Sequence, residues 1–245
     1  MKILLLYPEM PDTFFLFKHI SRVSGKKSSF PPQGLLTVAA MLPADWELKL
    51  IDAKVEVLKD EQIQWADMVL ISAMNTQAKS ALETINRCKK LGAVIVAGGP
   101  LFTHEHDRFE NVDHFVLNEA EITLPLFLKD LEDNELKRIY QTDEFADVHE
   151  TPIPKWELVN PDNYAYSIVQ YSRGCPFHCD FCDVTVLFGN KPRVKTTEMI
   201  IAELDEILSH GKPEMILFAD DNLIGNKGYL KKELLPGLIE WRDKN

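Results

Sequence analysis

Three of the four cysteines in this 245-residue chain lie within eight positions, at Cys175, Cys179 and Cys182. Their spacing is C-x3-C-x2-C, within the segment Arg-Gly-Cys-Pro-Phe-His-Cys-Asp-Phe-Cys that begins at residue 173. Thiolates are soft ligands, suited to zinc, copper(I) or the iron of iron–sulfur clusters. Three thiolates on one tight loop can hold three irons of a cubane cluster and leave the fourth open to a small molecule. No second C-x2-C pair is present to close a tetrahedral zinc site.

The segment resembles the signature of the radical S-adenosylmethionine (SAM) enzymes, C-x3-C-x-aromatic-C, with Phe181 as the aromatic residue. The resemblance implies that the three cysteines hold a 4Fe–4S cluster whose open iron chelates SAM, with Phe181 beside the cofactor. Reductive cleavage of SAM then yields a 5′-deoxyadenosyl radical, with electrons from a donor such as flavodoxin or ferredoxin. A motif match is a hypothesis, and a zinc site or three structural thiols are the alternatives.

The charge balance and the apolar runs limit the classes of partner. With 27 Lys and Arg against 38 Asp and Glu, the net charge is −11, which argues against nucleic acid or an anionic membrane surface. The apolar start at residues 3–7 is too short for a secretory signal, and no run approaches membrane-spanning length. We therefore expect a cytoplasmic protein, in a reducing compartment where clustered cysteines are more often metal ligands than disulfides.

Residues 1–140 alternate short apolar runs with helical patterns. Near-continuous apolar runs are typical of parallel strands buried on both faces, and here they cover residues 3–7, 48–51, 68–72, 94–97 and 114–117. Helices are predicted at 34–42, 59–65, 77–91 and 124–132. Five such repeats predict an α/β fold with a doubly wound, Rossmann-like, five-strand parallel sheet. Cys88 lies in the apolar stripe of its helix, so we expect a buried small residue and not a fourth ligand.

Ligands of doubly wound sheets bind at the carboxyl ends of the strands, near the point where the strand order reverses. The candidates there are Ser72 and Asn75 after the third strand, Gly98, Gly99 and Pro100 after the fourth, and Glu119 after the fifth. Paired glycines let a flat or bulky ligand lie against bare backbone. The G-x-G-x-x-G fingerprint is missing after the first strand, which disfavours nicotinamide and flavin dinucleotides.

This half of the chain is similar to the cobalamin-binding domain that precedes the radical core in one large branch of the superfamily, which includes methylases. The shared features are Pro-Pro-Gln-Gly-Leu at 31–35, Gly-Gly-Pro at 98–100 and Glu-Ala-Glu at 119–121. The resemblance implies cobalamin packed over the loops that carry the residues just named. The D-x-H-x-x-G loop that supplies a histidine to cobalt elsewhere is absent, and His19 lies in no such motif. A domain that keeps the sheet without the ligand is the alternative.

Residues 141–166 contain three prolines and no periodicity, which predicts a linker. A strand over 167–172 then ends at the cysteine loop, as expected for a β/α barrel. Thr197 is predicted to cap a helix that stops at Gly211, before a strand over 215–218 and a helix over 231–241. That second strand ends in Asp220, Asp221 and Asn222, which by resemblance contact the amino and ribose groups of SAM. A solvated turn is the alternative.

Residues 167–245 have room for two strand–helix units, which cannot close a barrel. We therefore expect the first part of a radical SAM partial barrel, as a fragment of a longer enzyme or completed by another polypeptide. The expected function is SAM cleavage with cobalamin-dependent methyl transfer to, or rearrangement of, an unactivated carbon in a small-molecule or lipid-like substrate. The alternatives are a cobalamin-independent radical SAM enzyme and a non-catalytic iron–sulfur or corrinoid-binding module.

Overall fold

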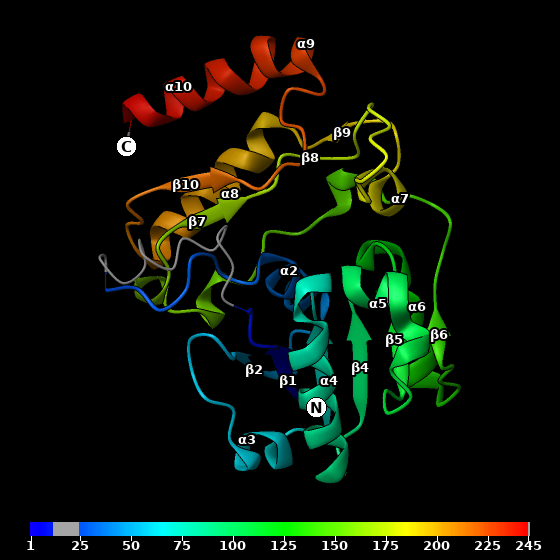
Figure 1. Cartoon of the computed structure of the whole chain (residues 1–245). Helices are drawn as coiled ribbons and strands as arrows, with labels where there is room; N and C mark the ends of the chain where they lie inside the picture. The colour runs from blue at the N-terminus through cyan, green and yellow to red at the C-terminus, as the bar shows by residue number, and fades with distance from the viewer. Residues whose placement is uncertain (12–24, 245) are drawn as a thin grey trace.

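The computed structural model describes residues 1–11 and 25–244, so His19 lies outside the described residues (Figure 1). A six-stranded sheet, parallel at every pairing, forms the first half of the chain in the order β2-β1-β3-β4-β5-β6. Its strands are β1 (Lys2–Tyr7), β2 (Glu47–Asp52), β3 (Met68–Ser72), β4 (Ile95–Gly98), β5 (His114–Val116) and β6 (Ile139–Tyr140). The strand order reverses between β1 and β3, which places the ligand-binding edge of such a sheet there.

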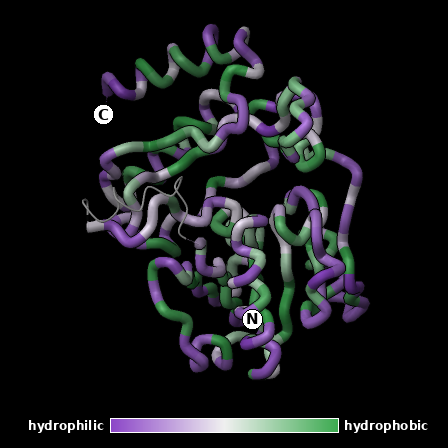
Figure 2. Tube along the Cα trace, in the orientation of Figure 1, coloured by the Kyte–Doolittle hydropathy of each residue, from purple (hydrophilic) through white to green (hydrophobic). Residues whose placement is uncertain are grey.

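Helices cover both faces of this sheet, which confirms the doubly wound α/β class. One face packs against α3 (Asp60–Trp65), α4 (Ala78–Lys90) and α5 (Pro100–Glu105), and the other against α2 (Gln33–Met41) and α6 (Ala120–Asp133). Alternate residues of β1 serve the two layers, since Leu4 and Leu6 join the first core and Ile3 and Leu5 the second. The colouring of Figure 2 shows β4 as a largely apolar strand, as burial on both faces requires.

The structure corrects the prediction for residues 1–140 in three places, one strand and two helices. The sheet has a sixth strand, β6, whose two residues are too few to give a periodic pattern. Helix α5 begins at Pro100, where only a turn was predicted, because proline is favoured at the first helical position. Helix α6 begins at Ala120, one turn before the predicted start, and Pro125 lies inside it.

The second half of the chain contains a separate parallel pair, β7 (Ser167–Val169) with β10 (Ile216–Phe218). Helix α8 (Thr197–His210) lies between them in sequence, so these elements form the predicted start of a β/α partial barrel. Strands β8 (Ser172–Arg173) and β9 (Arg193–Val194) form an antiparallel pair, with α7 (Val184–Phe188) between them in sequence. The chain continues through α9 (Lys227–Tyr229), a π-helical turn η7 (Leu230–Leu234) and α10 (Leu235–Lys244).

Two local predictions in this half are also corrected. The strand predicted over 167–172 ends at Val169, and Ser172 belongs to the antiparallel pair instead. Thr196, not Thr197, caps α8, because its hydroxyl oxygen accepts the Met199 N–H at 3.2 Å. The helix stops at Gly211 as predicted.

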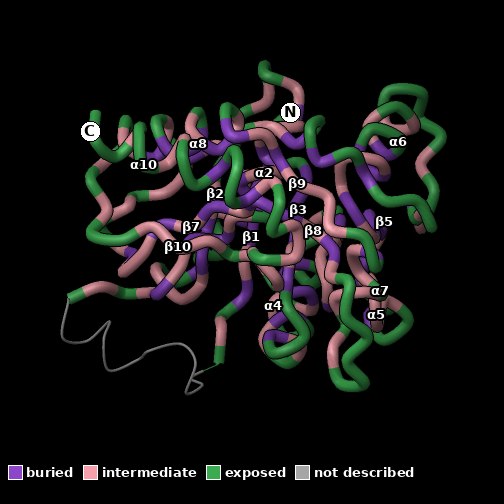
Figure 3. Tube along the Cα trace, turned by 90° about the horizontal axis from the view of Figure 1, so that it is seen from above, coloured by how far each residue is buried: buried purple, intermediate pink, exposed green. Residues whose placement is uncertain are grey.

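A third apolar cluster joins the two halves through the intervening segment. It contains Leu36 of α2 and Trp156, together with Val169 of β7 and Ile200 and Leu204 of α8. Figure 3 shows the burial concentrated along the central strands, with exposed turns around the rim. Short 3₁₀ turns lie at η2 (Asn75–Gln77), η3 (His106–Arg108), η4 (Val148–Glu150), η5 (Trp156–Leu158) and η6 (Pro161–Asn163). Among the described helices, none combines the length and the apolar character that crossing a membrane demands.

Candidate functional site

The three clustered cysteines lie on the loop between β8 and β9, which we call the cysteine loop (residues 174–192). Its two ends are held together because Arg173 pairs directly with Arg193 across the antiparallel ladder. Inside the loop the Cys175 N–H donates to the Gly189 carbonyl at 3.2 Å, and the Cys182 N–H donates to the Cys179 carbonyl at 3.1 Å. Cys179 is exposed, Cys175 and Cys182 are half-buried, and all three are free thiols.

The sulfur atoms of these three thiols do not all lie within 4.8 Å of one another. Zinc–sulfur bonds of about 2.3 Å bring the sulfur atoms to about 3.8 Å from one another. Among the described residues, the group of three metal-ligating side chains with donor atoms within 4.8 Å is Glu157, Glu206 and His210, on η5 and α8, and not the cysteines. A cubane cluster, in which each cysteine binds a different iron, suits the wider arrangement. The loop therefore fits an iron–sulfur cluster better than zinc.

The polar residues after β10 take different roles from one another. The Asp220 carboxylate accepts the Tyr171 N–H at 3.1 Å, the Ser172 N–H at 2.5 Å and the Ser172 hydroxyl. Burial raises the pKa of Asp220, although these hydrogen bonds oppose the rise. Asp220 thus fixes the chain that leads into the cysteine loop, a role that sequence reasoning missed.

Asn222 lies against the cysteine loop, where its Nδ2 donates to the Cys175 Sγ at 3.5 Å. Asp221 is exposed, and burial of part of its carboxyl with the nearby Asp220 charge raises its pKa. Phe181 is 92% exposed on the outside of the loop. The predicted SAM contacts of Phe181, Asp220, Asp221 and Asn222 stay predictions, and Asn222 is the one whose side chain donates to a cysteine of the motif.

The predicted corrinoid contacts gather at the carboxyl ends of β3 and β4. These strands are neighbours, and Ser72 pairs with Gly98 in register. A Cβ on Gly98 would lie 2.6 Å from the Val116 carbonyl, and a Cβ on Gly99, which has φ of 90°, would lie 2.7 Å from the Ser72 Oγ. Packing between strands therefore requires both glycines, whatever else binds there. Asn75 and Pro100 begin η2 and α5 at the same edge.

Glu119, the last of the predicted corrinoid contacts, has a carboxylate surrounded by protein groups. It accepts from Arg173 Nη1 at 3.0 Å, from Arg193 at 2.9 and 3.0 Å, and from the Ala146 N–H at 2.7 Å. Glu121 accepts from Arg173 Nη2 at 2.8 Å. Two buried carboxylates and two partly exposed guanidinium groups thus form a neutral network between the start of α6 and the β8–β9 pair. Its role in binding cobalamin stays a prediction.

We expect the ionised Glu121 carboxylate to contribute to the free energy of unfolding in a way that depends on pH. Burial by itself raises the pKa of its carboxyl, but Arg173 and the Thr151 hydroxyl lower the pKa below the ordinary 4.5 overall. A carboxyl with a lowered pKa stabilises the fold above its unfolded pKa and loses that contribution as the pH falls through the folded value. In denaturant titrations, Glu121→Gln should be less stable than wild type at neutral pH, and the gap should close at acid pH. If the free energies of unfolding of wild type and Glu121→Gln differed by the same amount at every pH, the stabilising role of the Glu121 carboxylate would be contradicted.

Comparisons with known proteins match both halves of the chain. A sequence model of the B12 binding domain matches residues 26–128, and one of the radical SAM superfamily matches residues 169–239. The chain is 41% identical over all of its length to an uncharacterized methyltransferase of Synechocystis sp.. It is 33% identical over 99% of its length to the hopanoid C-2 methylase of Rhodopseudomonas palustris. It covers 46% and 47% of these proteins, so it spans about half the length of the curated relatives it matches.

The fold itself has solved counterparts. The chain aligns with the radical SAM methyltransferase TsrM of Kitasatospora setae at a TM-score of 0.74 and 14% identity, over 100% of this chain and 52% of that one. It aligns with the cobalamin-dependent radical SAM enzyme OxsB at 0.70 and 19%, over 98% and 37%. The cofactors of the two matched regions are cobalamin for the first, and a 4Fe–4S cluster with SAM for the second. The chain therefore belongs to the branch of the radical SAM superfamily that carries an N-terminal cobalamin-binding domain.

Proposed function

We propose that this chain forms the cofactor-binding half of a methyltransferase that acts on an unactivated carbon of a small-molecule substrate. The observation that carries the proposal is the loop with three free cysteines, which lies against Asn222 at the end of β10 and follows a parallel sheet of the cobalamin-binding type. When bound, the cluster supplies the electron that cleaves SAM, and cobalamin carries the methyl group. The proposed division is residues 1–140 for the corrinoid, 141–166 as linker, and 167–245 for the cluster and SAM.

The residues of the chain hold and shield these groups. Cys175, Cys179 and Cys182 provide the iron ligands, and the Asn222 amide donates to the Cys175 sulfur, the kind of contact that tunes a cluster's potential. A large macrocycle is proposed to lie over the carboxyl ends of β3 and β4, where Gly98 and Gly99 allow the neighbouring backbone segments to approach closely. No histidine is expected to reach the cobalt from a D-x-H-x-x-G loop, since that loop is absent from the sequence.

The substrate and the electron donor are proposed on narrower grounds. Relatives named for hopanoid and bacteriochlorophyllide substrates favour a lipid-like or other small molecule. The exposure of Cys179 and Phe181 leaves one side of the cysteine loop accessible to a donor such as flavodoxin or ferredoxin.

Anaerobic reconstitution of the chain with iron, sulfide and hydroxocobalamin tests this function. We expect the visible spectrum to show both a cluster and a corrinoid after gel filtration, and reduced protein to convert SAM to 5′-deoxyadenosine. A cluster without a corrinoid would remove the methyltransferase and favour a cobalamin-independent radical enzyme. Both cofactors without 5′-deoxyadenosine would favour a binding module.

A further inference from the structure

The two arginines of this network mark the two ends of the cysteine loop. Arg173 lies two residues before Cys175, and Arg193 lies opposite it in the β8–β9 ladder. Every residue of the C-x3-C-x2-C motif lies between them. Both guanidinium groups donate to the same carboxylate, that of Glu119. A single side chain at the N-cap of α6 therefore holds both strands at the base of the loop. We call this base, formed by Arg173 and Arg193, the neck of the loop.

A second set of contacts extends this attachment to the segment between the two halves. Glu121 accepts from Arg173 and from the Thr151 hydroxyl, at 2.8 and 2.7 Å. Arg193 donates to the carbonyls of Ala146 and Phe188, the latter at 2.9 Å, and its guanidinium lies 5.3 Å from the Phe145 ring. The network thus contacts the sheet, the intervening segment and the cysteine loop at once.

The burial and charge of the network favour a geometric role. The side chains of Glu119 and Glu121 are 2% and 6% exposed, and those of Arg173 and Arg193 are 11% and 20% exposed. Buried ion pairs add little net stability over apolar packing, but removal of one partner leaves an uncompensated charge. The forked arginine–carboxylate geometry fixes direction as well as distance. Such a network is suited to holding a loop in one position.

We propose that Glu119 and Glu121 are positioning residues that clamp the neck of the cysteine loop to the ligand-binding edge of the sheet. The clamp sets the placement of the cluster relative to the corrinoid, and so rests on the proposed function. Glu119 acts through Arg173 and Arg193 and touches neither cofactor, which differs from the expectation that it contacts cobalamin.

The test compares Glu119→Gln, Glu121→Gln, Arg173→Lys and Arg173→Gln, with Arg87→Lys as a matched control. Arg87, in the last turn of α4, makes an exposed ion pair with Asp60 at the start of α3, and neither residue belongs to the network. Three readouts are taken on the reconstituted chain after circular dichroism confirms folding. They are the rate of cluster loss to a ferrous chelator, the hydroxocobalamin affinity, and the electron paramagnetic resonance spectrum of the reduced cluster with and without SAM.

If the clamp exists, the network variants should change the two cluster readouts and leave the hydroxocobalamin affinity nearly unchanged. Glu119→Gln should lose its cluster about tenfold faster and show an altered spectral response to SAM, because charge-assisted hydrogen bonds at the neck are lost. Its hydroxocobalamin affinity should stay within about twofold of wild type. Arg173→Lys, which keeps the charge, should fall between wild type and Arg173→Gln. Arg87→Lys should match wild type in all three.

Each other outcome overturns the proposal in a distinguishable way. A large loss of hydroxocobalamin affinity in Glu119→Gln with unchanged cluster kinetics would make Glu119 a corrinoid contact. Network variants that all match wild type would leave the proposed function standing and remove the clamp. A wild-type chain that assembles no cluster would remove both.

Discussion

Replacement of Cys179 by alanine is expected to abolish cluster binding while leaving the fold intact. Loss of a partner that only supports a metal ligand already costs about 10- to 100-fold in affinity, so loss of a ligand should cost more. Because Cys179 is exposed, its removal leaves no cavity, and the free energy of unfolding should change by no more than about 0.5 kcal/mol. Iron and sulfide analysis after anaerobic reconstitution, with denaturant unfolding, measures the two quantities separately.

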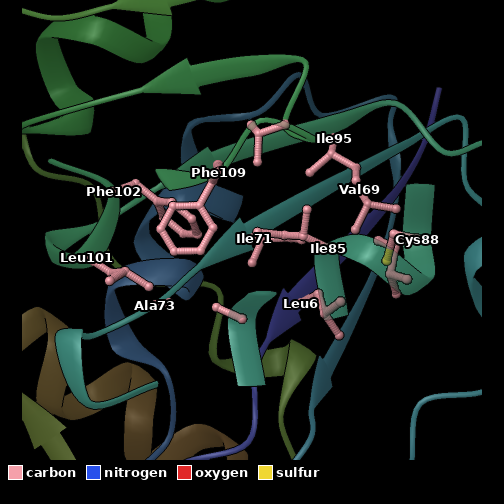
Figure 4. Packing of buried hydrophobic residues seen from close by; sticks show 14 of the residues in the cluster. Leu6, Val69, Ile71, Ala73, Ile85, Cys88, Ile95, Leu101, Phe102 and Phe109 are labelled. Atoms are coloured by element: carbon pink, nitrogen blue, oxygen red, sulfur yellow. The ribbon is translucent and has the colours of Figure 1, made fainter. Parts of the chain in front are cut away.

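Cys88 provides the matched control, with the opposite expectation. It is fully buried in the core between α4 and the sheet (Figure 4), and burial raises the pKa of its thiol to about 11. A buried, neutral thiol is inert as a ligand. Cys88→Ala should therefore lower stability by about 1 kcal/mol and keep the full iron and sulfide content. Cluster loss in Cys88→Ala, or a retained cluster in Cys179→Ala, would contradict the ligand assignment.

The parts of the fold that could be predicted are those whose signal is local. The strand predicted over 68–72 matches β3 at both ends, because burial on both faces leaves a continuous apolar run. Strand β6 could not be predicted, because its two residues are a strand only by pairing with β5. Helix α5 was missed because the Gly-Gly-Pro sequence that starts it is equally typical of a turn.

The candidate site likewise contains residues that could be predicted from a local motif and residues whose role only the fold reveals. The three candidate cysteines could be picked out from the sequence because they fall within one short motif. The partners that position them are distant in sequence: Glu119 is 54 positions from Arg173 and 74 from Arg193, and Asp220 is 48 from Ser172. Sequence reasoning placed Glu119 and Asp220 at strand ends and expected them to meet cofactors. Only the fold reveals that their carboxylates are already occupied by arginines and by backbone N–H groups.

The second large effect is expected at Gly174, between Arg173 and the first cysteine. Its φ is +87°, and a Cβ there would lie 2.5 Å from the Lys191 carbonyl and 2.9 Å from that of Phe188. Alanine would add the left-handed backbone cost of about 1–2 kcal/mol and force the two sides of the loop apart. Gly174→Ala should therefore lose the cluster at least about tenfold faster, since each factor of ten corresponds to about 1.4 kcal/mol. Limited proteolysis should cut within residues 174–192, while the sheet stays protected.

A substitution at Gly92 distinguishes the backbone cost of a positive φ from the steric clash of the added Cβ. Its φ of +80° is close to that of Gly174, but a Cβ there would meet nothing within 4 Å. Gly92→Ala should therefore show only the backbone cost, about 1–2 kcal/mol in unfolding free energy, with cluster loss at the wild-type rate. The amount by which Gly174→Ala speeds cluster loss beyond Gly92→Ala measures the close approach of Gly174 to the carbonyls of Lys191 and Phe188. If Gly174→Ala held its cluster as tightly as Gly92→Ala, the closed neck would not be what holds the three cysteines in place.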